Sequence, residues 1–291
     1  MVKVSTKDLL LWIKSIASND INGDAESLYL LLDLVGGISK VDLNLLKIND
    51  KDYTFLKEDL NIIKNKWIEF KSTKKPIQYI CGKTFWRNYK FQLSNYVLIP
   101  RVETEQIVDI ISSIYNNPEK KLLFADLGTG SGVIAISLSL LSKNWHGLAT
   151  DVDCRSINLA KRNFQMLSSQ SNLDFYHGSW WDPLRHFVGQ LDFVVSNPPY
   201  IPDEVYEKLP AMIKDYEPRL ALSGGKEGLS HIVKIILDAP KYLKKGGWIF
   251  LENHFDQGER IQDLLRLSGF DSIRIIQDFF GIGRFTIGRY K

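Results

Sequence analysis

The sequence predicts an α/β protein in which a parallel sheet follows a small all-helical region. From Leu122 onward, short apolar runs alternate with segments of helical period, which is typical of a parallel sheet with helices on both faces. The first 75 residues instead place their apolar side chains at helical spacing, with no obvious strand. A length of 291 residues accommodates both parts, because it corresponds to about two typical domains.

Residues 1–75 are predicted to form an N-terminal helical domain that recognises the substrate. The second of its three periodic stretches stops at Gly36-Gly37, and the third predicts a helix from about Tyr53 to Phe70. The domain has no cluster of catalytic residues, so we expect it to bind the partner rather than to perform chemistry. The periodic positions are Leu9, Leu10, Ile13, Ile16 and Ala17; Leu28, Leu31, Leu32 and Val35; and Leu56, Leu60, Ile63 and Trp67.

Residues 76–100 are predicted to form a β-hairpin linker, and residues 101–291 a catalytic domain. In the linker, aromatic residues alternate on both sides of a turn at Arg87-Asn88. The predicted strands of the catalytic domain are LLFADL (122–127), HGLATD (146–151), LDFYHG (173–178), LDFVVSN (191–197), GWIFLEN (247–253), SIRIIQDF (272–279) and RFTIGRY (284–290). Helices are predicted around 134–140, 156–167, 229–242 and 261–267.

The composition argues against several classes of protein. A net charge of +3 is too small for affinity that comes from neutralising a long run of phosphates, so no stable nucleic-acid binding is expected. Two cysteines, Cys81 and Cys154, and five histidines are scattered, which predicts neither a disulfide scaffold nor a metal site. We expect no secretory signal and no membrane partner, because the longest apolar runs are too short. The expected location is the cytoplasm, or an organelle interior in a eukaryotic source.

The turn Gly128-Thr129-Gly130-Ser131-Gly132 follows the first strand of the catalytic domain and predicts a ligand site. Glycines permit close backbone approach, and the following helix presents free N–H groups at its start. Val133 stands where a dinucleotide-binding turn needs its third glycine. Asp151 ends the next strand, 21 residues after Gly130, where a carboxylate can accept hydrogen bonds from both ribose hydroxyls. The pair favours a nucleoside with an amino-acid-like tail.

Other interpretations of these residues stay open. The glycines can serve only as a tight strand-to-helix turn, with Asp151 as a cap of the next helix. Within Gly178-Ser179-Trp180-Trp181, after the third strand, an indole face can pack on an adenine. Either tryptophan is equally suited to the hydrophobic core.

The tetrapeptide Asn197-Pro198-Pro199-Tyr200 follows the fourth strand and is the most informative stretch of the chain. Two prolines remove two backbone donors and fix φ, so the loop holds acceptors in a rigid frame. The Asn197 side-chain carbonyl and the Pro198 carbonyl suit a planar nucleophile with an NH₂ group, either a side-chain amide or the amine of a base. Orienting that nitrogen is itself catalytic. The alternative is a proline turn that merely ends the strand.

The chain resembles the class I S-adenosylmethionine-dependent methyltransferases and, more narrowly, the release factor glutamine methyltransferases of the HemK/PrmC type. Besides the glycine turn and NPPY, the resemblance rests on PIQYI (76–80) with Gly82, LIPRVETE (98–105) and EPRLAL (217–222). It covers about residues 75–290. LIPRxETE and EPRLAL are specific to that family, whereas GxGxG and NPPY are shared with enzymes that methylate amino groups of DNA and RNA.

This resemblance implies a seven-stranded, mostly parallel Rossmann-like methyltransferase sheet whose last strand is antiparallel, with an N-terminal helical domain and a β-hairpin. It implies S-adenosyl-L-methionine as the cofactor. The implied acceptor is the side-chain nitrogen, N5, of the glutamine in the Gly-Gly-Gln motif of class I peptide chain release factors, a protein methylation in translation termination. We expect the enzyme to be a monomer.

Residue by residue, the resemblance assigns a site. Ser179 departs from members with an acidic residue before the tryptophan, and Asn253-His254 replace the commoner strand ending. Arg101 and Glu103 are interpreted as residues of a helix N-terminus, with Arg101 shaping the entrance to the site. The implied cofactor-binding residues are Gly128, Thr129, Gly130, Ser131, Gly132, Asp151, Trp180 and Asn197, and the implied catalytic and substrate-binding residues are Asn197, Pro198, Pro199 and Tyr200.

Two other functions compete with this one. An amino-methyltransferase acting on adenine or guanine of DNA or RNA can use the same acceptors, although the low net charge and the lack of a target-recognition domain for base flipping argue against it. A noncatalytic cofactor-binding scaffold is the third hypothesis, and the intact NPPY and Asp151 argue against that.

Overall fold

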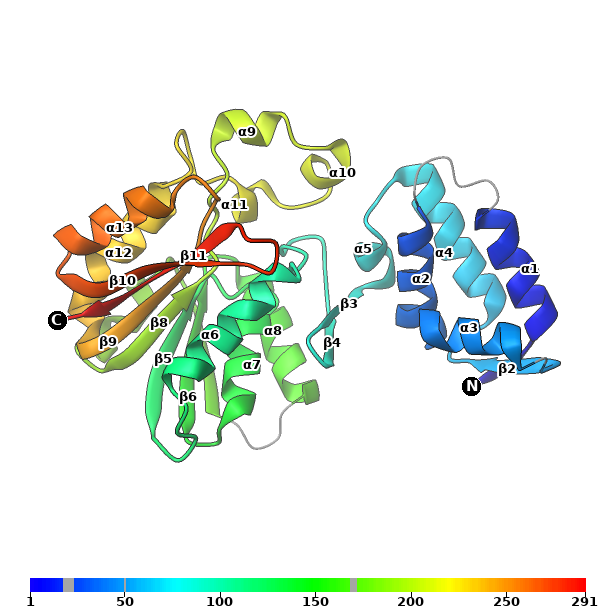
Figure 1. Ribbon diagram of the computed structural model, residues 1–291, viewed down its shortest axis with the longest axis horizontal. Coiled ribbons are helices and arrows are strands. Elements are labelled where there is room, and N and C mark those ends of the chain that lie inside the picture. The colour runs from blue at the N-terminus through cyan, green and yellow to red at the C-terminus, as the bar shows by residue number, and fades with distance from the viewer. Residues whose placement is uncertain (18–23, 50, 168–171) are drawn as a thin grey trace. The chain divides into compact units, whose positions relative to one another are not determined.

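In the computed structural model, which describes residues 1–17, 24–49, 51–167 and 172–291, the chain forms two units, Met1–Phe85 and Trp86–Lys291 (Figure 1). Apolar side chains of the first unit form one buried cluster, and those of the second form two, one on each face of a sheet. No helix among the described residues is long and apolar enough to cross a membrane.

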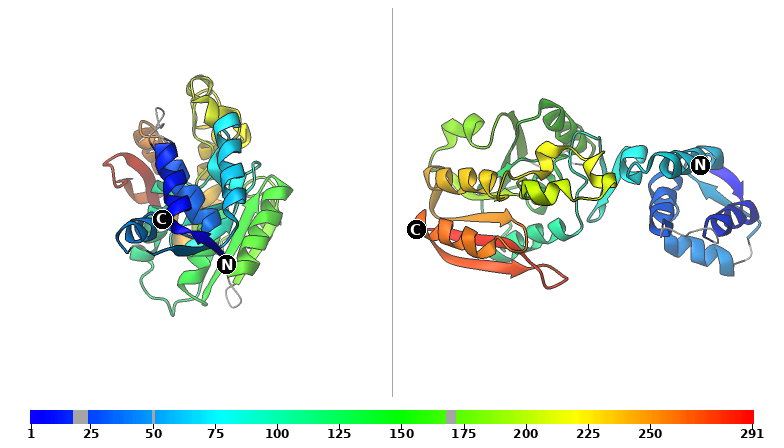
Figure 2. Two further views of the ribbon diagram at one scale, coloured as in Figure 1. Left: turned by 90° about the vertical axis from the view of Figure 1, so that its right-hand side faces the viewer. Right: turned by 90° about the horizontal axis from the view of Figure 1, so that it is seen from above.

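Amphipathic helices build the N-terminal unit, and Figure 2 shows them gathered together. Their apolar faces meet in a core that includes Leu9, Ile63 and Trp67, so most of the predicted periodic positions are buried, whereas Leu10 and Ile16 are only partly buried. Ser39 begins one helix with a capping box, in which its side chain and that of Asp42 each accept a backbone N–H. The elements are β1 (Val2–Ser5), α1 (Thr6–Ala17), α2 (Ala25–Leu31), a π-helical turn (Leu32–Gly36), α3 (Lys40–Ile48), β2 (Tyr53–Leu56), α4 (Leu60–Thr73) and α5 (Ile77–Cys81).

The prediction that residues 1–75 lack strands is wrong, as is the prediction of a helix that begins at Tyr53. Strands β1 and β2 pair antiparallel, and α4 begins later, after an N-cap at Asp59 whose side chain accepts from Asn61 N at 2.7 Å. Aromatic and β-branched residues of β2 favour extended backbone. A run of four residues is too short for periodicity to distinguish strand from helix.

Seven described strands of the second unit form one sheet, in the order β10-β11-β9-β8-β5-β6-β7. Strands β5 to β9 pair in parallel, and β11 runs antiparallel to both neighbours, which confirms the predicted architecture. The strand order reverses between β5 and β8, so a crevice for ligands is expected at their carboxyl ends. The bounds are β5 (Leu122–Leu127), β6 (Trp145–Asp151), β7 (Asn172–His177), β8 (Leu191–Ser196), β9 (Leu243–Glu252), β10 (Phe270–Gln277) and β11 (Gly283–Tyr290).

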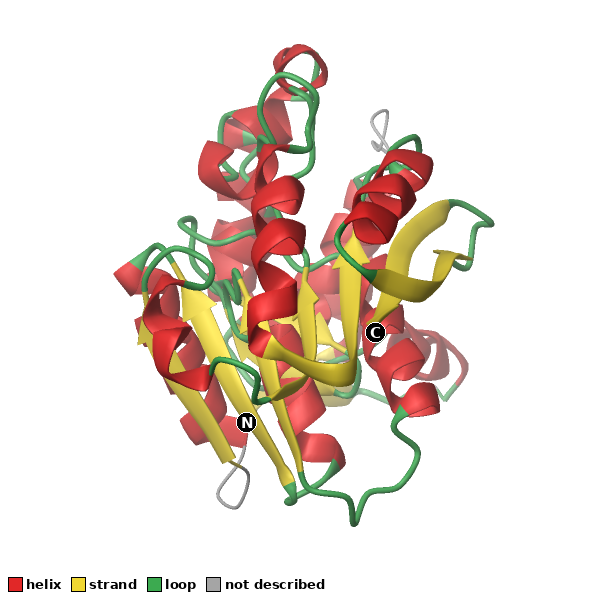
Figure 3. Cartoon of the chain, turned by 90° about the vertical axis from the view of Figure 1, so that its left-hand side faces the viewer, coloured by secondary structure: helices red, strands yellow, loops and turns green. Residues whose placement is uncertain are grey.

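Helices cover both faces of this sheet (Figure 3). One buried cluster contains side chains of α6 (Gln106–Ile114) and α7 (Val133–Leu141), with α8 (Cys154–Leu167) packed against it. The other contains side chains of a 3₁₀ helix (Asp182–Phe187), α12 (Ser230–Tyr242) and α13 (Gly258–Leu267). Burial on both faces explains why the central strands read as nearly continuous apolar runs.

The remaining elements lie in the linker range, just after it, and in the connection between β8 and α12. The range 76–100, predicted to be a hairpin linker, contains α5 as well as the hairpin of β3 (Lys83–Trp86) and β4 (Tyr89–Gln92). Trp86 Nε1 donates to Ser137 Oγ at 2.8 Å, which fixes the end of β3 on α7. A 3₁₀ turn (Glu103–Glu105) precedes α6, and α9 (Asp203–Glu207), α10 (Ala211–Lys214) and α11 (Arg219–Leu222) lie between β8 and α12.

Candidate functional site

The glycine-rich turn between β5 and α7 has a backbone that requires glycine. Gly128, Gly130 and Gly132 have φ angles of +77°, +55° and +85°. A Cβ atom on Gly132 would lie 2.9 Å from Ile136 Cδ1 and 3.0 Å from Ala160 Cβ, so this glycine permits α7 to pack against α8. A Cβ on Gly130 would meet nothing within 4 Å. The turn therefore presents bare backbone to open space, which a ligand can approach closely.

Asp126 anchors this turn from inside the protein. Its Oδ2 accepts hydrogen bonds from Thr129 Oγ1 (2.7 Å) and Ala135 N (3.2 Å), while its Oδ1 has no partner among the described residues. Burial raises the pKa of Asp126 to about 7, although both hydrogen bonds act to lower it. Our sequence analysis missed this residue, and the available signal was a single acidic residue inside an otherwise apolar strand.

Asp151 joins the end of β6 to the glycine turn. Its Oδ2 accepts from Gly130 N and its Oδ1 from Asp153 N, each at 2.9 Å. Burial raises the pKa of Asp151, and these two hydrogen bonds oppose the rise. A carboxylate offers about four acceptor positions, so about two are left for a ligand. Asp151 thus supports the turn and also lines the pocket beside it.

The structure separates the two tryptophans, of which the resemblance assigned Trp180 to the cofactor. Trp181 is 3% exposed and stacks on Tyr242, with ring centroids 4.5 Å apart, so it belongs to the core. Trp180 lines the pocket, and its ring lies 3.2 Å from the position that a Cβ of Gly128 would take. Its φ of +46° is unusual for a residue other than glycine and directs this side chain to the pocket. Ser179 is exposed beside it.

The NPPY tetrapeptide continues from β8 at the same edge of the sheet. Asn197 and Pro199 line the pocket, whereas Pro198 and Tyr200 are not among its lining residues. Asn197 Nδ2 donates to Thr104 Oγ1 at 3.3 Å. The Tyr200 hydroxyl donates to Glu252 Oε1 at 3.0 Å, and burial near that carboxylate raises the tyrosine pKa.

Glu252 is a second buried acid that our sequence analysis missed. It ends β9, is 1% exposed, and its Oε2 has no partner among the described residues. Burial raises its pKa, against the hydrogen bond from Tyr200 and the positive charge of Arg284. Arg284 Nε in turn lies 2.6 Å from Asp278 Oδ2.

Two segments that the resemblance singled out meet above the pocket. Arg101 Nη2 lies 2.6 Å from Glu217 Oε1, and Glu217 Oε2 accepts from Ile99 N at 3.3 Å. Glu217 is 4% exposed, so this ion pair holds LIPRVETE against EPRLAL. Arg101 therefore also joins two segments of the pocket wall, in addition to the helix-start role and the place at the site entrance that the sequence analysis gave it.

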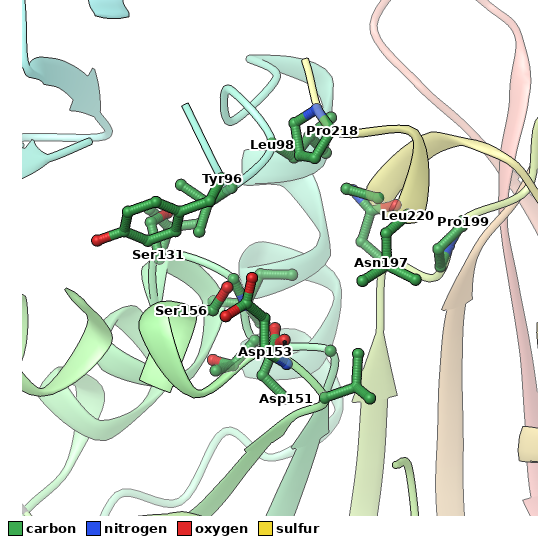
Figure 4. A pocket seen from close by; sticks show the side chains of 18 of the residues that line it. Tyr96, Leu98, Ser131, Asp151, Asp153, Ser156, Asn197, Pro199, Pro218 and Leu220 are labelled. Carbon is green, nitrogen blue, oxygen red and sulfur yellow. Dashed lines mark hydrogen bonds between the residues drawn. The ribbon is translucent and has the colours of Figure 1, made fainter. Parts of the chain in front are cut away.

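Most of the predicted residues line one pocket in the second unit, whereas Gly132, Pro198 and Tyr200 do not (Figure 4). Leu98 and Pro100 come from one segment of its wall and Leu220 from the other; Figure 4 shows Leu220 beside Asn197, with Asp151 at the lower end of the pocket. His231 and Lys234 of α12 also line it, although no sequence signal indicated them. A bare glycine turn, a carboxylate with acceptors to spare and an indole fit a nucleoside with a polar tail, and Asn197 adds a side-chain amide beside it.

Comparison with known proteins gives consistent results. Residues 107–226 match the family described as "Methyltransferase small domain". The chain is 37% identical over 284 residues to a release factor glutamine methyltransferase of Prochlorococcus marinus, an alignment that covers 97% of this chain and 96% of that one. It is 35% identical over 256 residues to the protein of that name from Synechocystis, covering 85% and 86% of the two chains.

A likeness to solved structures supports the fold. The catalytic domain of hMettl16, solved with the MAT2A 3′UTR hairpin 6, aligns with a TM-score of 0.54 and 18% sequence identity. The alignment covers 69% of this chain and 74% of that one. At this level of identity the likeness concerns the sheet and its flanking helices alone.

Proposed function

The chain belongs to the release factor glutamine methyltransferase family, and we propose that it transfers a methyl group from S-adenosyl-L-methionine to the side-chain nitrogen, N5, of the Gly-Gly-Gln glutamine of class I peptide chain release factors. The observation that carries the proposal is that Asn197 lines the same pocket as the glycine turn and Asp151. The side-chain amide of Asn197, which can accept a hydrogen bond, thus lies next to a site that fits a nucleoside. Protein methylation of this kind belongs to translation termination.

Three groups of this chain would hold the cofactor. The open space beside Gly130, where a Cβ would meet nothing within 4 Å, suits its amino-acid tail, the remaining acceptor positions of Asp151 suit the ribose, and the Trp180 ring suits the adenine. Ser179 offers the adenine no acidic acceptor. When bound, S-adenosyl-L-methionine supplies an electrophilic methyl group.

Asn197 would bind and orient the glutamine. An amide nitrogen is a poor nucleophile because its lone pair is delocalised into the carbonyl, so placement must supply much of the catalysis. With its own NH₂ group directed to Thr104, Asn197 can offer Oδ1 to an N–H of the substrate amide. The Pro198 carbonyl is the proposed second acceptor, and Pro199 and Tyr200 complete the rigid loop. The nitrogen loses a proton after methylation, when it is strongly acidic, so no general base is required.

Labelled cofactor distinguishes this function from its competitor. The protein is incubated with methyl-labelled S-adenosyl-L-methionine and a purified release factor, a release factor with Gln→Ala in the Gly-Gly-Gln motif, or DNA and RNA. We expect label on the glutamine of the first acceptor alone, located by mass spectrometry of peptides. Label on an adenine or guanine amino group instead would show that the protein methylates DNA or RNA.

The variant Asn197→Ala tests the orienting role. We expect cofactor affinity to stay within about tenfold while the single-turnover rate falls ~10²-fold or more, because an orienting contact in the transition state is lost. Asn158→Ala, on the exposed side of α8, is the control and should keep the wild-type rate. A near-normal rate for Asn197→Ala would contradict the proposed role.

A further inference from the structure

Two turns at the carboxyl edge of the sheet expose phenylalanine side chains. The turn between β10 and β11 carries Phe279 and Phe280, which are 73% and 76% exposed, and the turn after β9 carries Phe255, which is 65% exposed. We call these three side chains the aromatic rim. Gln106 Nε2 donates to Gln277 O at 3.0 Å, so the first of these turns lies close to the start of α6 (Figure 1).

Hydrogen bonds from Asn253 join the two turns. Asn253 N donates to Arg284 O at 2.9 Å, and Asn253 Nδ2 donates to Gly283 O at 3.4 Å. The same Nδ2 donates to His254 O at 2.9 Å. Asn253, one of the two residues that replace the commoner strand ending, thus ties the turn after β9 to the first residues of β11, and the aromatic rim belongs to one continuous stretch of surface.

The carboxylate of Asp278 holds the turn between β10 and β11 in a fixed shape. Its Oδ1 accepts from Phe280 N at 2.9 Å and from Ile282 N at 3.1 Å, and its Oδ2 accepts from Arg284 Nε at 2.6 Å. Because this turn is already ordered, a partner that binds its aromatic rings has little conformational entropy of the turn to overcome. An ordered turn that exposes two neighbouring aromatic rings is typical of an interaction site.

The aromatic rim adjoins the NPPY tetrapeptide. Gln257 Nε2 donates to Tyr200 O at 2.9 Å, and Gln257 Oε1 accepts from His254 N at 3.0 Å. The centroid of the His254 ring lies 6.5 Å from that of Tyr200 and 4.4 Å from that of Phe255. A macromolecule that inserts one of its groups at NPPY therefore brings the neighbouring part of its surface to the rim.

The charge of the two turns favours a protein over a nucleic acid as that macromolecule. Residues 253–258 and 277–284 contain the acids Asp256 and Asp278 and the arginine Arg284. Arg284 Nε lies 2.6 Å from Asp278 Oδ2, so a carboxylate already compensates its charge. Such a surface attracts phosphates weakly, whereas aromatic side chains are enriched in interfaces between proteins.

We propose that the aromatic rim is a docking surface that binds an apolar patch of the release factor next to its Gly-Gly-Gln loop. The inference rests on the proposed function and deepens it, because it names the surface of this chain that holds the body of the protein acceptor while NPPY holds the glutamine. A short peptide with the Gly-Gly-Gln sequence would lack that patch.

Steady-state methylation by variants of the full-length protein tests the proposal. We expect Phe279→Gln/Phe280→Gln to lower kcat/KM on intact release factor ~10- to 100-fold, mainly through KM, because truncated aromatic anchors weaken binding by this order. On a short Gly-Gly-Gln peptide, kcat/KM should stay within about threefold of the wild type, as should the Kd of the cofactor. Phe255→Gln, in the other turn, should shift KM in the same direction. Phe279→Leu/Phe280→Leu keeps apolar side chains and should recover most of the loss.

The matched control is Leu237→Gln/Leu267→Gln, which removes two apolar side chains that are exposed on α12 and α13 instead of on the two turns. We expect wild-type kinetics on both substrates. Equal KM values for the rim and control variants on intact release factor would overturn the proposal, and so would an equal loss on the short peptide. Methylation of DNA or RNA that the rim variants lose, or a dimer in light scattering that they dissociate, would assign the rim to another occupant and overturn it too. Methylation of a different protein by the wild type would contradict the proposed substrate, and the same comparison on that protein would still test the rim.

Discussion

Replacing Asp151 by alanine should weaken the binding of S-adenosyl-L-methionine without unfolding the protein. Two of the approximately four acceptor positions of this carboxylate hold Gly130 N and Asp153 N, and the other two are assigned to ribose hydroxyls. The variant loses both sets of contacts. The two backbone N–H groups lie at the pocket wall, where water can replace the carboxylate, so the loss should appear mainly in binding.

The size of the effect follows from these contacts. A hydrogen bond to a charged group contributes about 1.5–3 kcal/mol. Part of this is offset, because the burial that raises the Asp151 pKa also makes its charge costly in the free enzyme. We therefore expect a net loss of ~1–3 kcal/mol, which corresponds to a roughly 5- to 150-fold higher Kd.

Isothermal titration calorimetry with S-adenosyl-L-methionine and with its demethylated product measures this loss. Asp153→Asn removes a neighbouring charge that pairs with Arg155 at 2.6 Å, and it should change Kd by less than about threefold. NAD should not bind either protein, because Val133 occupies the position of the third glycine of a dinucleotide turn. An unchanged Kd in a folded Asp151→Ala protein would refute the assignment of Asp151 to the ribose.

Two further predictions concern stability and the N-terminal unit. The raised pKa of Asp126, about 7 when folded, means that its contribution to stability is complete below about pH 4 and is lost as the pH rises towards 7. Asp126→Asn keeps an oxygen for both hydrogen bonds. Urea unfolding should show that the fall in unfolding free energy between pH 5 and 8 is smaller in this variant by about 2 kcal/mol. An unaltered pH dependence would mean that another group causes the fall. Removing residues 1–75 should lower kcat/KM on intact release factor far more than on a short Gly-Gly-Gln peptide, and equal losses would show that this region builds the active site.

Local motifs carried most of what the sequence by itself determined. A glycine turn with positive φ at three positions and a double proline each impose a backbone conformation within a few residues, so their chemistry can be inferred before the fold is known. The alternation of apolar runs and helical periods likewise determined a parallel sheet, because the apolar pattern within each segment shows which of its faces are buried. Strand order then brings the two motifs together at one edge.

Roles that depend on distant partners needed the tertiary structure. Glu217 pairs with a residue 116 positions away, and Asn197 donates to Thr104, 93 positions before the asparagine. Nothing near these residues in sequence shows that they are buried together. The two neighbouring tryptophans make the same point, because their residue type alone leaves them equivalent and the backbone at Trp180 directs that indole to the pocket. Adjacent residues determine the local backbone conformation. The burial and hydrogen-bond partners of the site residues arise only when β5, β8 and β9 align in the sheet.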